Sequence, residues 1–152
     1  MLFNPLQVGS LTLPNRILLA PLTRARADAG HMPNALMAEY YSQRATGGLL
    51  ISECTMVAPG TSAFVNEPGI YNDAQIAAWR QVTDAVHAKG GRIFMQIWHA
   101  GRAAYPGAAD GAPIVSSVAT AIEGEIHTPQ GKLPHAVPRP LTALLTTSDA
   151  AH

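Results

Sequence analysis

The chain has 152 residues, ten of them basic and ten acidic, so its formal net charge at pH 7 is zero. This length leaves room for one ordinary domain, and a hydrophobic content of 47% is typical of globular rather than disordered proteins. A balanced charge provides no electrostatic attraction to nucleic acid or to an anionic membrane, so we expect neither as a partner.

Cysteine content, histidine spacing and the first residues narrow the class of protein further. Cys54 is the single cysteine, which excludes an internal disulfide and agrees with a reducing compartment. The six histidines never fall at an HxxxH or HExxH spacing, so we predict no metal site. Residues 1–5 do not begin a signal peptide, and no apolar run approaches the roughly 20 residues needed to cross a bilayer. These features predict a cytoplasmic protein.

The first part of the chain predicts a hairpin followed by a strand. Apolar residues alternate weakly between residues 6 and 13 and the chain turns at Gly9 and Ser10, a pattern typical of a β-hairpin. Residues 17–20 then form an unbroken apolar run, which suits a strand buried on both faces of a parallel sheet. Residues 23–30 read as a loop.

A helix is predicted to follow this loop. Pro33 suits its first turn, because a first-turn N–H would be unpaired in any case. Apolar side chains recur at helical spacing at Leu36, Met37, Tyr40 and Tyr41. The glycines at 47–48 would end this helix, and residues 49–57 form a second, mostly apolar strand.

A second helix and a third strand complete the regular pattern. Asn72 is a good N-cap, and Gln75 occupies the third helical position of a capping box. The apolar stripe of this helix is predicted at Ile76, Trp79, Val82 or Thr83, and Val86. The glycines at 90–91 would end the helix, and residues 92–98 form the next strand.

The order hairpin, β, α, β, α, β predicts an α/β fold with parallel strands and right-handed crossovers. From about residue 103 to residue 140, proline, glycine, alanine, serine and threonine dominate. Apart from a hairpin turning at Gly131, no further element is expected there. So long a stretch without regular elements is unusual in a compact domain.

Ligands of βα folds bind at the carboxyl ends of the strands, which here are residues 21–23, 53–55 and 96–99. Gln96 interrupts an apolar strand, and an unpaired buried amide costs about 1–3 kcal/mol. A flat heterocycle with alternating carbonyl and N–H groups would pair with this amide, and so would neighbouring backbone. Motifs GxGxxG, GxxxxGK[ST] and GxSxG are absent, which disfavours a nicotinamide Rossmann domain and an α/β-hydrolase.

Three other residues at these strand ends have both a ligand-binding and a structural interpretation. Thr23 can donate its hydroxyl to the same heterocycle or bond within its own turn. Cys54 is most simply an inert packed thiol. Trp98 can form a pocket wall or belong to the core.

The chain contains several recognisable motifs in a fixed order: LFNPL at 2–6, LPNRI at 13–17, APLTR at 20–24, ISECT at 51–55, GIYN at 69–72, QIWHAGR at 96–102 and PRPL at 138–141. Together these motifs resemble the old yellow enzyme family of FMN-dependent (β/α)8-barrel ene-reductases. The segment at 96–102 is the most specific of these, and the resemblance covers residues 1 to about 142.

The resemblance implies a role for each candidate site residue. Pro21, Leu22 and Thr23 would border the FMN isoalloxazine, with Thr23 bonding near the flavin O4. The backbone at Cys54 would meet the ring, Gln96 would bind its pyrimidine edge, and Trp98 would line the substrate pocket. In the family, NAD(P)H reduces FMN, which then passes hydride from N5 to the β-carbon of a small-molecule activated alkene.

The family continues into five more strands that this chain does not contain. Those strands carry the His/Asn or His/His pair that grips the substrate, the tyrosine that protonates it and the arginine site for the FMN phosphate. We therefore expect residues 1–142 to be the N-terminal part of an incomplete, truncated (β/α)8 TIM barrel, consisting of the hairpin and first three βα strands. Residues 143–152 form a divergent tail, and no catalytic residue lies on the chain.

Two other functions remain open at this stage. A half-barrel has unpaired strand edges and an uncovered apolar face, so the chain could be a structural protein that pairs with a second copy or with a partner chain. A βα module that binds a ligand other than flavin is the third hypothesis.

Overall fold

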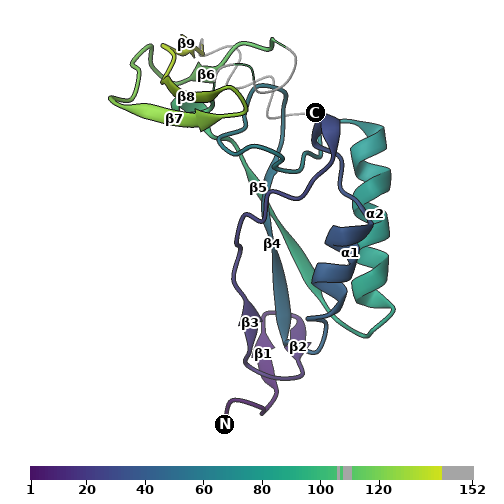
Figure 1. Cartoon of the computed structure of the whole chain (residues 1–152). Helices are drawn as coiled ribbons and strands as arrows, with labels where there is room; N and C mark the ends of the chain where they lie inside the picture. The colour runs from purple at the N-terminus through teal and green to yellow at the C-terminus, as the bar shows by residue number, and fades with distance from the viewer. Residues whose placement is uncertain (106, 108–110, 142–152) are drawn as a thin grey trace. The chain divides into compact units, whose positions relative to one another are not determined.

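The computed structural model describes residues 1–105, 107 and 111–141 (Figure 1). The chain divides into two compact units: Met1–Thr55 with Asn66–Trp98, and Met56–Val65 with His99–His152. The first unit contains both helices and the parallel sheet. The second unit contains short strands and loops.

The first unit begins with the predicted hairpin. Strands β1 (Leu6–Val8) and β2 (Leu11–Leu13) pair antiparallel, with Leu6 opposite Leu13. Gly9 occupies the turn at φ 56°, a conformation that glycine adopts without steric cost. The predicted hairpin is therefore confirmed.

A three-stranded sheet follows in the order β3 (Leu18–Leu19), β4 (Leu49–Met56) and β5 (Ile93–Trp98). β3 pairs parallel to β4. The Leu50 N–H donates to the Arg92 carbonyl at 2.9 Å, and the Gln96 N–H donates to Ser52 Oγ at 3.1 Å. Both strands therefore advance in the same direction, as the β-α-β-α-β order predicts.

The burial expected for the first strand of this sheet is wrong. β3 spans only two residues, of which Leu18 is 47% exposed, and the preceding residue, Ile17, is 39% exposed. β3 lies at the edge of the sheet, with β4 on one side and no other described strand on its outer side. An edge strand is covered less than a central one, so its apolar residues remain accessible.

Helix α1 (Ala35–Ser42) starts and ends differently from the prediction. Asn34 is its N-cap and accepts a hydrogen bond from the Met37 N–H, so Pro33 precedes the cap instead of lying in the first turn. The helix ends well before Gly48. Any residue with a Cβ at this position would clash with the Asn15 carbonyl oxygen. This glycine permits a close backbone approach and does not terminate the helix.

Helix α2 (Asp73–His87) starts at the predicted N-cap, because Asn72 accepts from the Gln75 N–H at 2.9 Å. Its buried stripe consists of Gln75, Trp79, Val82 and Val86, whereas Ile76 is 43% exposed. The prediction began this stripe at Ile76, whereas the buried stripe begins one residue earlier, at Gln75. A polar glutamine is fully buried there because its side chain has hydrogen-bond partners.

The core of the first unit lies between the helices and the sheet. α1 and α2 lie side by side along one face of the strands in Figure 1. The buried hydrophobic cluster consists of Ala27, Met37, Tyr41, Ala45, Leu50, Trp79, Val82 and Val86, with Ile93 and Met95 of β5 packed against it. A short 3-10 helix, η1 (Ala29–His31), lies in the loop before α1.

The second unit is built from short paired strands. β6 (Val115–Ser116) pairs parallel with β9 (Arg139–Pro140). β7 (Glu125–Thr128) and β8 (Gly131–Pro134) form an antiparallel hairpin, which confirms the turn expected at Gly131. The 3-10 helix η2 (Gly101–Ala103) and the β6–β9 pair were not predicted. The predicted tail at residues 143–152 lies outside the described residues.

Within the described part of the chain, no helix is both long and apolar enough to span a bilayer. The same residues contain no cluster of three or more His, Cys, Asp or Glu side chains arranged to hold a metal ion.

Candidate functional site

The turn after β3 lies against β4. Thr23 Oγ1 is 2.8 Å from Cys54 Sγ, and either atom can be the donor. Pro21 and Thr23 are half-buried, while the Leu22 side chain is 54% exposed. Two of the three predicted strand ends therefore meet, and an apolar side chain next to them remains available to a ligand.

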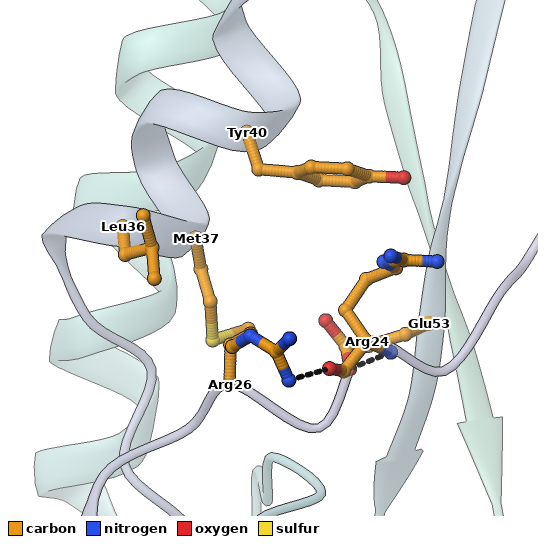
Figure 2. Close-up of a pocket in the computed structure, with 6 residues that line it drawn as sticks. All are labelled: Arg24, Arg26, Leu36, Met37, Tyr40 and Glu53. Atoms are coloured by element: carbon orange, nitrogen blue, oxygen red, sulfur yellow. Dashed lines mark hydrogen bonds between the residues drawn. The ribbon is translucent and has the colours of Figure 1, made fainter.

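Glu53, the residue before Cys54, holds the backbone of the same turn. One carboxylate oxygen, Oε2, accepts hydrogen bonds from the Arg24 N–H at 2.9 Å and from the Ala25 N–H at 3.2 Å. Figure 2 shows the first of these bonds as a dashed line. The Glu53 side chain is 1% exposed, so these bonds lie in an environment where water competes little.

Tyr41 of α1 holds Glu53 from the helix side. The Tyr41 hydroxyl donates to Glu53 Oε1 at 3.3 Å and accepts from the Glu53 backbone N–H at 2.7 Å. Tyr41 is itself 1% exposed. The carboxylate is therefore bonded on both sides, to a helix and to a turn.

Burial dominates the electrostatics of this pair. Burial raises the pKa of Glu53 above its ordinary value, and hydrogen bonds from Arg24 and Ala25 oppose that rise. Burial also places the pKa of Tyr41 well above its ordinary range, so the phenol remains neutral. The arrangement is a neutral hydroxyl beside a carboxyl group that is costly to ionise.

Cys54 is a packed thiol. Its side chain is 4% exposed, and burial raises its pKa to about 11, partly offset by the hydrogen bond with Thr23. A thiol with this pKa is almost entirely protonated at neutral pH and therefore is a poor nucleophile. The structural interpretation of its side chain agrees with this burial.

Gln96 lies on the side of β5 that faces away from the helices. Ile93 and Met95 pack against the helix-covered core, so the alternation of a strand directs Gln96 to the opposite face. The side chain is half-buried, and no hydrogen bond to its amide is present among the described residues. This amide is free to bind a ligand.

β4 connects the two predicted ligand contacts. Thr23 touches Cys54 on one side of this strand, and the Gln96 N–H bonds Ser52 on the other. Both predicted residues therefore border the same short stretch of the central strand. Trp98 is half-buried at the last position of β5, further along the same strand.

A cavity of about 140 Å³ lies beside this turn, between it and α1 (Figure 2). Its lining consists of Arg24, Arg26, Leu36, Met37, Tyr40 and Glu53. The Arg24 guanidinium lies 5.6 Å from the centre of the Tyr40 ring. The sequence placed Glu53 at a predicted strand end and Tyr41 in the apolar stripe of its helix, but it predicted no contact between these two residues, although a charged residue inside an apolar strand was a visible signal.

The three-stranded parallel sheet and its two helices form an α/β arrangement, and ligands of such folds bind at the carboxyl ends of the strands. Residues 1–136 match the family described as NADH:flavin oxidoreductase / NADH oxidase, and the chain belongs to this family. The resemblance to old yellow enzymes is thus confirmed.

Individual relatives agree with this assignment. The chain is 52% identical over 134 residues to chanoclavine-I aldehyde reductase fgaOx3 of Penicillium roqueforti, which covers 85% of this chain and 36% of that protein. It is 48% identical over 125 residues to a probable flavin mononucleotide-dependent alkene reductase of Leishmania infantum, covering 82% of this chain and 34% of that protein.

A solved structure extends the agreement to three dimensions. The old yellow enzyme homologue from Zymomonas mobilis superposes with a TM-score of 0.89 at 44% identity, over 95% of this chain and 40% of that chain. The chain therefore spans about a third of the curated relatives and two fifths of this structural neighbour. The α/β class and the barrel relationship are confirmed. The family description also agrees with the expected FMN and nicotinamide chemistry.

Proposed function

We propose that this chain provides the flavin-ring side of the FMN site in an NAD(P)H-dependent ene-reductase of the cytoplasm. The observation that carries the proposal is the free amide of Gln96, on the open side of β5 and next to the strand that Thr23 also contacts. FMN, when bound, supplies the hydride chemistry, and the protein positions the ring and the alkene.

The residues present fit an isoalloxazine ring. The pyrimidine edge of the ring alternates carbonyl and N–H groups, and the amide of Gln96 offers both a carbonyl and an NH2 group to this edge. The Thr23 hydroxyl can donate to a ring carbonyl. Leu22 and Pro21 offer apolar surface to the ring, and the backbone at Cys54 can approach it closely, since the side chain is turned toward Thr23.

We assign no catalytic residue to this chain. The substrate-gripping pair, the proton-donating tyrosine and the phosphate site that the family resemblance implies lie beyond the strands present here. FMN binding by the isolated 152 residues is therefore expected to be weak, because losing about 4 kcal/mol of binding energy lowers affinity roughly a thousandfold. Reduction of an activated alkene by this chain alone is expected to be undetectable.

Titration with FMN tests this function. The purified chain should quench flavin fluorescence and shift the flavin absorption bands, and Gln96→Leu should weaken binding by about tenfold, since it removes the polar contacts without changing the side-chain size much. Gln81→Leu, at an exposed position of α2, is the matched control and should bind as the wild type does. Equal affinities for Gln96→Leu and the wild type would contradict the proposed ring contact. They would favour a βα module for another ligand.

A second candidate function is a half-barrel that pairs with a second copy or a partner chain. Exposed apolar side chains at the sheet favour it: Leu18 at 47%, Phe94 at 51% and Ile97 at 67%. Sedimentation velocity distinguishes the two cases. A dimer that Ile97→Lys dissociates would support pairing through the sheet, whereas a concentration-independent monomer would rule out pairing with itself.

A further inference from the structure

We propose that Glu53 is a positioning residue that aligns Thr23 with the flavin, by holding the backbone of the Thr23–Ala25 turn from the central strand. This inference rests on the proposed function, and it extends that function to a residue that does not itself touch the ring. It stands on four hydrogen bonds that converge on Glu53.

The turn depends on an acceptor from outside its own segment. Ala25 has φ 52°, in the left-handed region that a residue with a Cβ seldom adopts. The N–H groups of Arg24 and Ala25 both point at Glu53 Oε2, and this oxygen is their acceptor among the described residues. A turn in this unfavourable conformation is stable only where several surrounding contacts hold it in place.

The two hydrogen bonds from the turn to Glu53 Oε2 act as a clamp on the turn. This clamp is rigid because Glu53 is fixed at two further atoms. Tyr41 bonds Oε1 and also the Glu53 backbone N–H, so the side chain cannot swing away from the turn without breaking a contact to α1. Both residues are almost fully buried. Rotamers locked by packing and by further hydrogen bonds are what hold a binding group in its productive geometry.

The next residue of β4 completes the arrangement. Cys54 Sγ contacts the Thr23 hydroxyl at 2.8 Å, while Glu53 holds the backbone that immediately follows Thr23. Two consecutive strand residues therefore fix the side chain and the backbone of one turn. A donor to a flavin carbonyl stabilises the reduced ring, which carries more negative charge, so movement of this turn would change the reduction potential of the flavin.

The test uses the full chain with FMN and four variants: Glu53→Leu, which removes the acceptor, Thr23→Ala, their double variant, and Glu39→Gln as an exposed control on α1. Glu53→Leu should shift the flavin spectrum in the same direction as Thr23→Ala does, and it should likewise lower the midpoint potential. The double variant should match Thr23→Ala alone, since Glu53 acts through Thr23. Additive effects of the two substitutions would overturn the proposal.

Hydrogen exchange of the flavin-free chain tests the clamp separately. The Arg24 and Ala25 amides should exchange at least tenfold faster in Glu53→Leu, which has no acceptor for them, while amides in the middle of α2 keep their wild-type rates. Unchanged rates at Arg24 and Ala25 would overturn the clamp whatever the flavin does. If the wild type failed to bind FMN, the proposed function would be overturned. The role of Glu53 toward flavin would then be overturned as well, even if exchange at Arg24 and Ala25 were faster in the variant.

A milder variant covers the case in which Glu53→Leu does not fold. Tyr41→Phe removes only the hydroxyl that fixes Glu53, so it should accelerate exchange at Arg24 and Ala25 and shift the flavin spectrum in the same direction by a smaller amount. A folded Tyr41→Phe chain with wild-type exchange at both amides would also overturn the proposal.

Discussion

The Tyr41 hydroxyl and Glu53 exchange two hydrogen bonds across the interface between α1 and β4. The hydroxyl accepts from the Glu53 backbone N–H at 2.7 Å and donates to its carboxylate at 3.3 Å. One phenol therefore pairs a strand amide and a buried carboxylate at once. This contact gives a buried acidic side chain the partners that it needs inside the sheet–helix core.

Tyr41→Phe should lower the free energy of unfolding by about 1–3 kcal/mol, because it leaves the Glu53 N–H and one carboxylate oxygen without this partner in a buried site. The ring itself remains, so packing against Trp79 should be preserved. Urea denaturation followed by tryptophan fluorescence measures the change. Tyr40→Phe is the matched control, since Tyr40 is only partly buried, and an equal loss in both variants would contradict the assigned role.

Stability should fall as pH rises above 4.5, the ordinary pKa of a glutamic acid, until it passes the raised pKa of folded Glu53. In that interval the folded chain retains a proton that the unfolded chain has released, so the unfolded state binds fewer protons and the slope of stability against pH is negative. Urea unfolding across this range measures the slope. Glu53→Gln should flatten the profile, and a slope identical to that of the wild type would assign the effect to another group.

Cys54 should react slowly with iodoacetamide. With a pKa of about 11, roughly one thiol in three thousand is ionised at pH 7.5, and the side chain is 4% exposed. Mass spectrometry should find the native chain largely unmodified under conditions that fully alkylate the chain in urea. Rapid alkylation of the native chain would mean that the turn at Thr23 opens readily.

The regular elements could be predicted because their signals are local. The hairpin turn at Gly9, the N-cap at Asn72 and the apolar strands 49–57 and 92–98 each depend on residues close in sequence, and the structure contains all of them. The strand ends likewise pointed to Thr23 and Gln96, because the carboxyl edge of a parallel sheet follows from topology alone.

The clamp could not be predicted in the same way. Glu53 bonds Arg24, which is 29 residues away, and Tyr41, which is 12 residues away. No local pattern indicates which buried donor will pair with a strand carboxylate. The predictions of a buried β3 and of the α2 stripe were wrong for a related reason. The burial of β3 depends on whether another strand lies beside it, and the burial of Gln75 depends on its hydrogen bond to the distant Gly30 carbonyl.

Gln75→Leu should destabilise the chain more than Asn72→Ala does. Asn72 caps α2 through one hydrogen bond to the Gln75 N–H, and losing such a cap costs about 1 kcal/mol. The Gln75 side chain is fully buried, accepts from the Tyr71 N–H at 2.9 Å and donates to the Gly30 carbonyl at 3.0 Å. Leucine would leave both backbone groups unpaired, at about 1–3 kcal/mol each. Urea unfolding of the two variants gives the ranking. If Asn72→Ala proved the more destabilising variant, the N-cap of α2 would contribute more to the stability of the chain than the hydrogen bonds of the Gln75 side chain do.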